Sequence, residues 1–126
     1  MSNRSPNAAE PPHRMDGDER RRHARARADL PITVLLDDGV HHAKIRDVSR
    51  GGVCFFLDRP LQEMTALEVE FDLPMDPGVR RIRGVGAVVR CEKIAQIVDH
   101  YEIAVFVHEM ADPDRDTITE YVDGGR

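Results

Sequence analysis

The chain has 126 residues, which is enough for one domain but not for two with separate hydrophobic cores. Its formal net charge is −5, which divides into about +2 for residues 1–30 and about −7 for residues 31–126. General nucleic-acid binders usually spread positive charge over a whole face, so we expect no DNA partner. No apolar stretch approaches the roughly 18 residues that cross a bilayer, and the N-terminus lacks the apolar segment of a signal peptide, so we expect a cytoplasmic protein with no membrane span.

The first 29 residues carry no hydrophobic periodicity. Residues 1–17 are rich in Pro, Asn, Ser and Ala, and this composition predicts a disordered tail. Residues 18–29, with the sequence DERRRHARARAD, contain almost no large apolar side chains that could dock against a core. We therefore predict that residues 18–29 form a mobile, Arg-rich arm.

From residue 30 onward the pattern changes to short apolar runs, several with a period of two, separated by turn residues. Asp38-Gly39 is a hairpin signal, residues 47–52 are predicted to be a loop, and Gly84 and Gly86 indicate a bend or β-bulge. Six strands are predicted, in residues 32–36, 43–48, 53–57, 67–71, 82–91 and 101–107.

The last predicted element is a short α-helix over residues 112–122. Asp112 can cap it with Pro113 at the first helical position, and three apolar side chains share one face, namely Ile118, Tyr121 and Val122. Six short antiparallel strands followed by one helix predict an all-β fold over residues 30–110, either a small barrel or a sandwich. Residues 123–126 are predicted to be a disordered end.

Two polar motifs stand out against this pattern. Arg21 and Arg25 are the only arginines of the arm that lie four residues apart, and Asp47-x-Ser49-x-x-Gly52 follows between two predicted strands. In this order and spacing the two motifs resemble the signature of PilZ domains. The likeness covers residues 18–122, including the segments 28–32, 45–53, 86–90 and 101–107.

The resemblance implies a six-stranded antiparallel split β-barrel of the PilZ type over residues 30–110. It further implies a bacterial, cytoplasmic receptor for the second messenger cyclic di-GMP, without enzymatic activity. It also implies which residues contact the ligand: Arg21, Arg25, Asp47, Ser49 and Gly52. Cyclic di-GMP presents two phosphates and two guanine Hoogsteen edges, and the planar guanidinium of Arg can meet either target with two hydrogen bonds. Further candidates for ligand contacts are Arg20, Arg22, Arg50 and Gly51.

The chemistry of the second motif leaves some roles open. An ionised Asp47 could accept the guanine N–H groups or hold an arginine in place. The Ser49 hydroxyl could donate to a phosphate or to a base acceptor. Gly52 lacks a Cβ, which permits a positive φ or a close approach of the backbone to the ligand.

These motifs predict that the ligand orders the arm over the barrel and thereby changes a surface that an unidentified protein effector recognises. Two alternatives remain: an interaction adaptor with the same barrel that binds no nucleotide, and an electrostatic tether to membrane or nucleic acid through the arm. The presence of the arginines argues against the adaptor.

The sequence offers no support for other chemistry. No nucleophile has a recognisable base partner, so we expect no catalytic residues and no enzyme. His41 and His42 would point to opposite faces of a strand, so we expect neither a metal site nor a cofactor. Cys54 and Cys91 lie in apolar strand segments and are expected to be reduced thiols.

Overall fold

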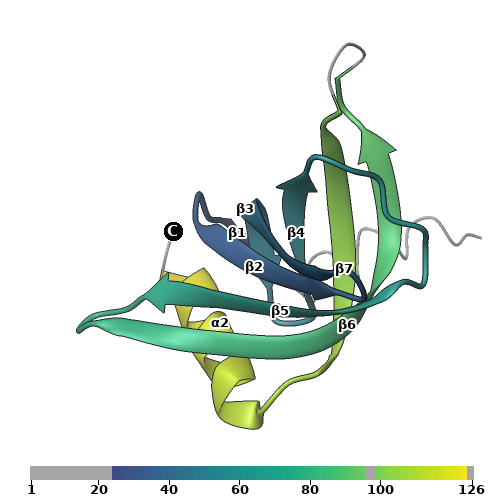
Figure 1. Cartoon of the computed structure of the whole chain (residues 1–126). Coiled ribbons are helices and arrows are strands. Elements are labelled where there is room, and N and C mark those ends of the chain that lie inside the picture. The colour runs from purple at the N-terminus through teal and green to yellow at the C-terminus, as the bar shows by residue number, and fades with distance from the viewer. Residues whose placement is uncertain (1–23, 96–98, 125–126) are drawn as a thin grey trace, which may run out of the picture.

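The computed structural model describes residues 24–95 and 99–124 (Figure 1). The predicted tail and the first half of the predicted arm, with Arg20, Arg21 and Arg22, lie outside the described residues. The described elements are, in chain order, β1 (Arg25–Arg27), β2 (Pro31–Leu36), β3 (Gly39–Ser49), β4 (Gly52–Leu57), β5 (Ala66–Pro74), β6 (Val79–Lys93), β7 (Tyr101–Glu109) and α2 (Asp112–Gly124).

Six of these strands close into a barrel. Antiparallel neighbours follow in the order β3-β2-β5-β6-β7-β4, and β4 pairs back with β3. This closure leaves none of the six with a fully free edge. The predicted six-stranded antiparallel barrel with a C-terminal helix is confirmed, and β1 is an additional strand paired with β3.

Alternating side chains fill the barrel interior. In β5 the apolar residues of the predicted period-two pattern, Leu67, Val69 and Phe71, are each less than 5% exposed, and the acidic residues between them face outward. This arrangement follows from the strand geometry, which sends successive side chains to opposite faces. The core is mainly aliphatic, with Phe55 and Phe71 as its buried rings.

The helix α2 covers one end of the barrel, and the β6–β7 hairpin projects at the other end (Figure 1). The predicted apolar face of α2 packs on the core, where Ile118 is 1% and Val122 3% exposed and Tyr121 is half-buried. The helix begins at Asp112 as predicted but continues to Gly124, so residues 123 and 124, predicted to belong to a disordered end, are helical. The first helical hydrogen bond runs from the Arg115 amide to the Ala111 carbonyl, so Ala111 and not Asp112 is the N-cap residue. No helix in the described ranges is both long enough and apolar enough to cross a membrane.

A β-bulge in β3 decides which way the second motif faces. The pairing of β3 with β4 shifts by one residue between Ile45 and Asp47, so Arg46 is an extra residue. In a regular strand side chains alternate between the two faces, so Asp47 would point into the core like Ile45, two residues earlier. The bulge turns Asp47 outward and leaves Val48 fully buried.

A second bulge lies in β6. The pairing with β7 shifts between Val88 and Arg90, which makes Val89 an extra residue. Val88 is fully buried, whereas Val89 is 50% exposed and Arg90 lies beside it on the outer face. A further register shift, between Val85 and Gly86, confirms the irregularity that the glycines of this strand predicted.

The strand β1 was not predicted. Its residues pair with Asp47–Ser49 of β3, and the Ala28 amide continues this ladder by donating to the Arg46 carbonyl. Backbone pairing needs no large apolar side chain, so the composition of residues 18–29 carried no sign of the strand. The second half of the predicted arm therefore lies along the same edge of β3 as β2.

The segment predicted as a loop is also shorter than expected. Asp47 and Ser49 belong to β3, and only Arg50 and Gly51 remain as the turn before β4. The reason is that β3 pairs on both edges here, with β1 on one side and β4 on the other. Both predicted site residues, Asp47 and Ser49, are therefore part of a strand that is paired on both edges.

Gly52 is expected to be a stability determinant. A Cβ at this position would collide with the Val105 carbonyl oxygen of β7, a backbone atom that cannot move aside. We predict that Gly52→Ala lowers the free energy of unfolding by about 1–3 kcal/mol, as overpacking typically does. Urea unfolding checks this, with Gly124→Ala as a control because a Cβ at Gly124 meets open space. Equal stability of the two variants would contradict the prediction.

Candidate functional site

A groove lies on the outer face of the barrel and crosses β4 and β7. Its floor is formed by three small residues that face outward in the middle of this surface, Gly52, Cys54 and Ala104. Its volume is about 760 Å³, which is within the usual range for small-molecule sites. We call this hollow, bounded by β1 and β3 on one side and by β6 and Phe106 on the other, the outer groove.

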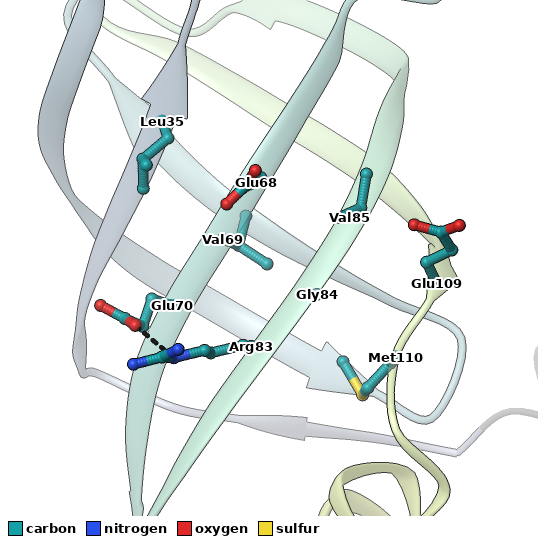
Figure 2. Close-up of a pocket in the computed structure, with 9 residues that line it drawn as sticks. All are labelled: Leu35, Glu68, Val69, Glu70, Arg83, Gly84, Val85, Glu109 and Met110. Carbon is teal, nitrogen blue, oxygen red and sulfur yellow. Dashed lines mark ion pairs between the residues drawn. The ribbon is translucent and has the colours of Figure 1, made fainter.

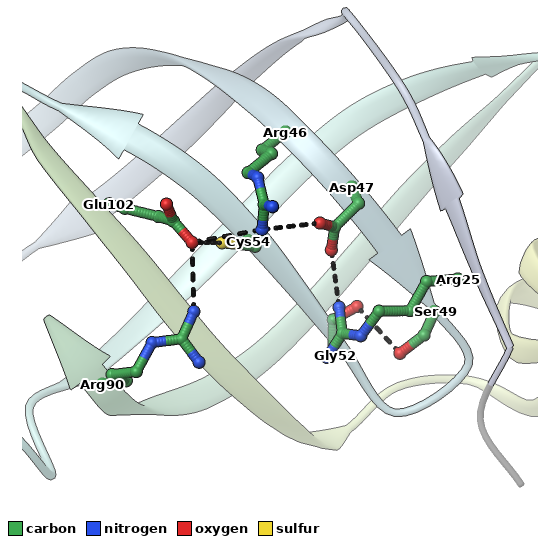
Figure 3. A network of polar contacts seen from close by, with 8 residues as sticks. All are labelled: Arg25, Arg46, Asp47, Ser49, Gly52, Cys54, Arg90 and Glu102. Atoms are coloured by element: carbon green, nitrogen blue, oxygen red, sulfur yellow. Dashed lines mark hydrogen bonds and ion pairs between the residues drawn. The ribbon is translucent and has the colours of Figure 1, made fainter. Parts of the chain in front are cut away.

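The first wall of the outer groove carries the predicted motif residues. Arg25 of β1 pairs with Ser49 of β3, and Ser49 pairs with Gly52 of β4, so the three lie on one rung of the sheet. The Arg25 Nη1 atom is 2.6 Å from the Asp47 Oδ1 atom (Figure 3). The structure therefore brings together four of the five predicted residues, and Arg21 lies outside the described part.

A chain of ion pairs continues from Asp47 across the outer groove (Figure 3). The Arg46 Nη1 atom lies 3.2 Å from Asp47 Oδ2 and 3.2 Å from Glu102 Oε2. The Arg90 Nη2 atom of β6 lies 3.1 Å from the same Glu102 oxygen. Positive and negative groups thus alternate from β1 to β6, where Arg90 also lies 3.9 Å from Glu92 Oε2. The charged residues that line the groove itself are three arginines and one carboxylate, Asp47.

Cys54 takes part in this network from the floor. Its thiol donates to Glu102 Oε2 at 3.4 Å. Burial raises the pKa of the thiol to about 11, and the nearby carboxylates of Asp47 and Glu102 raise it in the same direction. Cys54 is therefore a protonated, weakly reactive thiol at neutral pH. Both cysteines are free, as expected, and Cys91 is partly buried against the core.

The geometry refines the roles that the sequence left open. Asp47 holds an arginine, since it accepts hydrogen bonds from both Arg25 and Arg46. The positive-φ glycines of the described residues do not include Gly52, whose missing Cβ instead makes room for the backbone of β7. The Ser49 hydroxyl has only a long contact of 3.5 Å, to the Gly52 carbonyl oxygen.

Arg50 points away from the outer groove. Its Nη1 atom lies 2.8 Å from Thr119 Oγ1 and 3.3 Å from Asp116 Oδ1, both in α2. In return, Arg115 of α2 donates to the Arg50 carbonyl at 2.8 Å. Of the two additional candidates in this turn, Gly51 lines the groove and Arg50 fastens the turn to the helix.

Sequence reasoning did not identify Arg46, Arg90, Glu102 or Phe106 as site residues. The alternation of β7 does place Glu102, Ala104 and Phe106 on one face, opposite to the buried Ile103. That signal identifies an outer face, but only the pairing of β7 with β4 brings this face next to the second motif.

A second groove, of about 490 Å³, lies over β5 and β6 and has the opposite electrostatic character (Figure 2). It is lined by Glu68, Glu70 and Glu109 with a single cation, Arg83, which is paired with Glu70 at 2.6 Å. We call it the acidic groove. Its excess of negative charge disfavours an anionic ligand, so the outer groove is the better candidate site.

Comparisons with known proteins agree with this fold. The family profile described as PilZ domain matches residues 19–124. None of the curated proteins compared with the chain matches it.

Among solved structures, the chain is similar to the inhibitor of motility MotI/DgrA of Bacillus subtilis, with 20% identity and a TM-score of 0.73 over 82% of this chain and 50% of that chain. It is similar to the MrkH–c-di-GMP complex of K. pneumonia, with 19% identity and a TM-score of 0.60 over 82% and 51%. It is also similar to the PilZ domain with c-di-GMP of YcgR from Escherichia coli, with 18% identity and a TM-score of 0.63 over 82% and 89%.

The chain spans about half the length of the first two of these structures, and at such low identity all three support the fold alone. The family match covers most of the chain and agrees with the resemblance drawn from the two motifs. The chain therefore belongs to the PilZ domain family.

Proposed function

We propose that this protein is a receptor for cyclic di-GMP that binds the nucleotide in the outer groove and performs no catalysis itself. The observation that carries the proposal is the convergence of Arg25, Asp47, Ser49 and Gly52 at one wall of this groove. Two structures with the same fold, those of MrkH and YcgR, are described with c-di-GMP, and this supports the choice of ligand.

Arg25 is suited to the role of a ligand clamp. Its side chain is 46% exposed although one Nη atom is bound to Asp47, so other N–H groups remain free to contact a phosphate or a guanine edge. Asp47 fixes the direction of the guanidinium before the ligand arrives. Such preorganisation lowers the entropy that binding must remove from a long side chain.

The position of Arg25 in β1 also reduces the cost of ordering the arm. Fixing the backbone of a residue costs about 1–2 kcal/mol, whereas a bidentate Arg–guanine pair contributes only about 1–3 kcal/mol of discrimination. One arginine on a fully mobile arm could not offset the ordering of many residues. Because β1 is already paired with β3, we propose that Arg25 is the anchored half of the clamp and Arg21 closes it.

The turn between β3 and β4 offers a route from the ligand to a partner surface. Arg50 and Arg115 tie this turn to α2, as their hydrogen bonds of 2.8 Å show. A ligand that contacts Gly51, or Gly52 at the start of β4, therefore contacts a turn that is hydrogen-bonded directly to the helix. We propose that the closed arm, together with α2, forms the surface that a protein effector recognises.

The clamp predicts a specific dependence on arginine. Arg25→Ala is expected to weaken cyclic di-GMP binding by about tenfold or more, and Arg25→Lys is expected to restore little, because Lys supplies charge without the planar fork. Titration calorimetry with cyclic di-GMP, GTP and duplex DNA measures this directly.

Arg83→Ala is the matched control, since Arg83 is an exposed β6 arginine in the acidic groove and its loss should leave the affinity unchanged. The electrostatic tether is the correct account if two results are found together. Arg25→Lys binds as tightly as the unmodified protein, and the affinities for cyclic di-GMP and for duplex DNA both fall steeply as the salt concentration rises. A chain with an intact barrel that binds none of the three ligands would support the nucleotide-independent adaptor.

Closure of the arm predicts slower amide exchange. On addition of cyclic di-GMP, residues 18–30 are expected to gain protection, mainly before Arg25, because β1 and the Ala28 amide are already paired with β3. Hydrogen exchange read by mass spectrometry measures this, with the β5 strand as an internal reference that should not change. Tight binding with unchanged exchange in residues 18–30 would refute the closure while leaving the receptor function intact.

A further inference from the structure

Phe106 is an exposed aromatic residue in the middle of a well-packed strand. The residues before and after it in β7, Val105 and Val107, are 3% and 2% exposed, whereas Phe106 is 54% exposed. Isolated exposed apolar residues are common on protein surfaces and need no explanation by themselves. The position of Phe106 is what distinguishes it, because the ring lies on the wall of the outer groove that faces the motif residues.

The strand pairing leaves this ring uncovered on both sides. Phe106 pairs with Gly52 of β4 and with Ala87 of β6, and neither residue has a side chain large enough to cover an aromatic ring. The ring makes one aromatic contact, a tilted one with His108 at a centroid distance of 6.5 Å. Within the described residues, a large part of the ring therefore remains available to a ligand.

Arg25 lies on the same rung of the sheet. The rung runs from Arg25 to Ser49, from Ser49 to Gly52 and from Gly52 to Phe106, which is three strand spacings, or about 14 Å along the sheet. Gly52 lies between Ser49 and Phe106 on this rung and has no side chain that could separate them. A planar ligand in this interval meets a guanidinium at one wall and an aromatic ring at the other.

We propose that Phe106 is a stacking platform for a guanine base of the ligand, an inference that rests on the proposed receptor function. A purine presents a flat π face, and aromatic side chains bind such faces in single-stranded nucleic-acid proteins. Stacking tolerates any base, whereas hydrogen bonds to base edges discriminate. Phe106 thus supplies affinity, and Arg25 with Asp47 supplies recognition of guanine.

The first test compares two phenylalanines. Phe106→Ala is expected to weaken cyclic di-GMP binding about 5- to 150-fold, the range found when a stacking ring is removed, whereas Phe106→Tyr keeps the ring and should bind within about twofold of the unmodified protein. Phe56→Ala is the control, because Phe56 lies on β4 against His100 at 5.3 Å and does not line the outer groove. Circular dichroism confirms that each variant is folded.

The second test reads the contact itself. The chain contains no tryptophan, so Phe106→Trp places the only tryptophan at the proposed stacking position, where its fluorescence can be excited selectively over that of the two tyrosines. Saturating cyclic di-GMP is expected to quench its fluorescence strongly, and a Phe56→Trp variant should change little.

The outcomes separate the two proposals. If the unmodified protein binds cyclic di-GMP while Phe106→Ala binds equally well and Phe106→Trp is not quenched, the stacking inference is wrong and the receptor function stands. If the unmodified protein does not bind cyclic di-GMP at all, both proposals fail. Loss of affinity in Phe106→Ala together with quenching in Phe106→Trp supports both.

Discussion

The extra residue in β3 is the constraint on which the outer groove depends. Asp47 faces outward only because Arg46 shifts the register of β3 against β4. In an unbroken ladder the carboxylate would enter an aliphatic core beside Ile45, where an unpaired charge is very costly. The bulge thus converts a position of the core face into a position of the outer face, beside the outer groove.

Charged side chains of neighbouring strands surround the outward-facing Asp47. Asp47 is only 8% exposed, and it is stabilised by Arg25 and Arg46 together. Arg46 in turn shares Glu102 with Arg90, which the second bulge, at Val89, places on the opposite wall. Two bulges on opposite sides of a floor of small residues therefore account for both the hollow and its charge. Removing one carboxylate would leave neighbouring guanidinium groups close together without their partner.

Much of the fold followed from simple patterning. The alternation in β5, the turn residues Asp38 and Gly39 and the apolar face of α2 predicted an all-β barrel or sandwich with a C-terminal helix. The structure contains the closed barrel that the two motifs, through their resemblance to PilZ domains, favoured. The described residues of the two motifs also lie on the surface that carries the outer groove. These features were accessible because each depends on residues that are close together in the sequence.

The remaining features depend on the order and register of the strands, which local patterning does not determine. The strand β1 has no large apolar side chain and is recognised only by its backbone pairing with β3. The outward direction of Asp47 depends on a one-residue register shift that the local sequence does not indicate. Glu102 and Phe106 become site residues because β7 pairs with β4, some 50 residues earlier in the chain. Glu102 and Phe106 can therefore be recognised as candidate site residues only from the three-dimensional arrangement of the strands.

The central claim is that the nucleotide occupies the outer groove, and a two-dimensional amide NMR titration with cyclic di-GMP tests it most directly. The account predicts that the largest chemical-shift changes fall on β1, on residues 47–52 and on residues 104–107, while the acidic groove around Glu68, Glu70 and Val85 stays unchanged. Changes centred on the acidic groove, or no changes at a saturating concentration of the nucleotide, would contradict it.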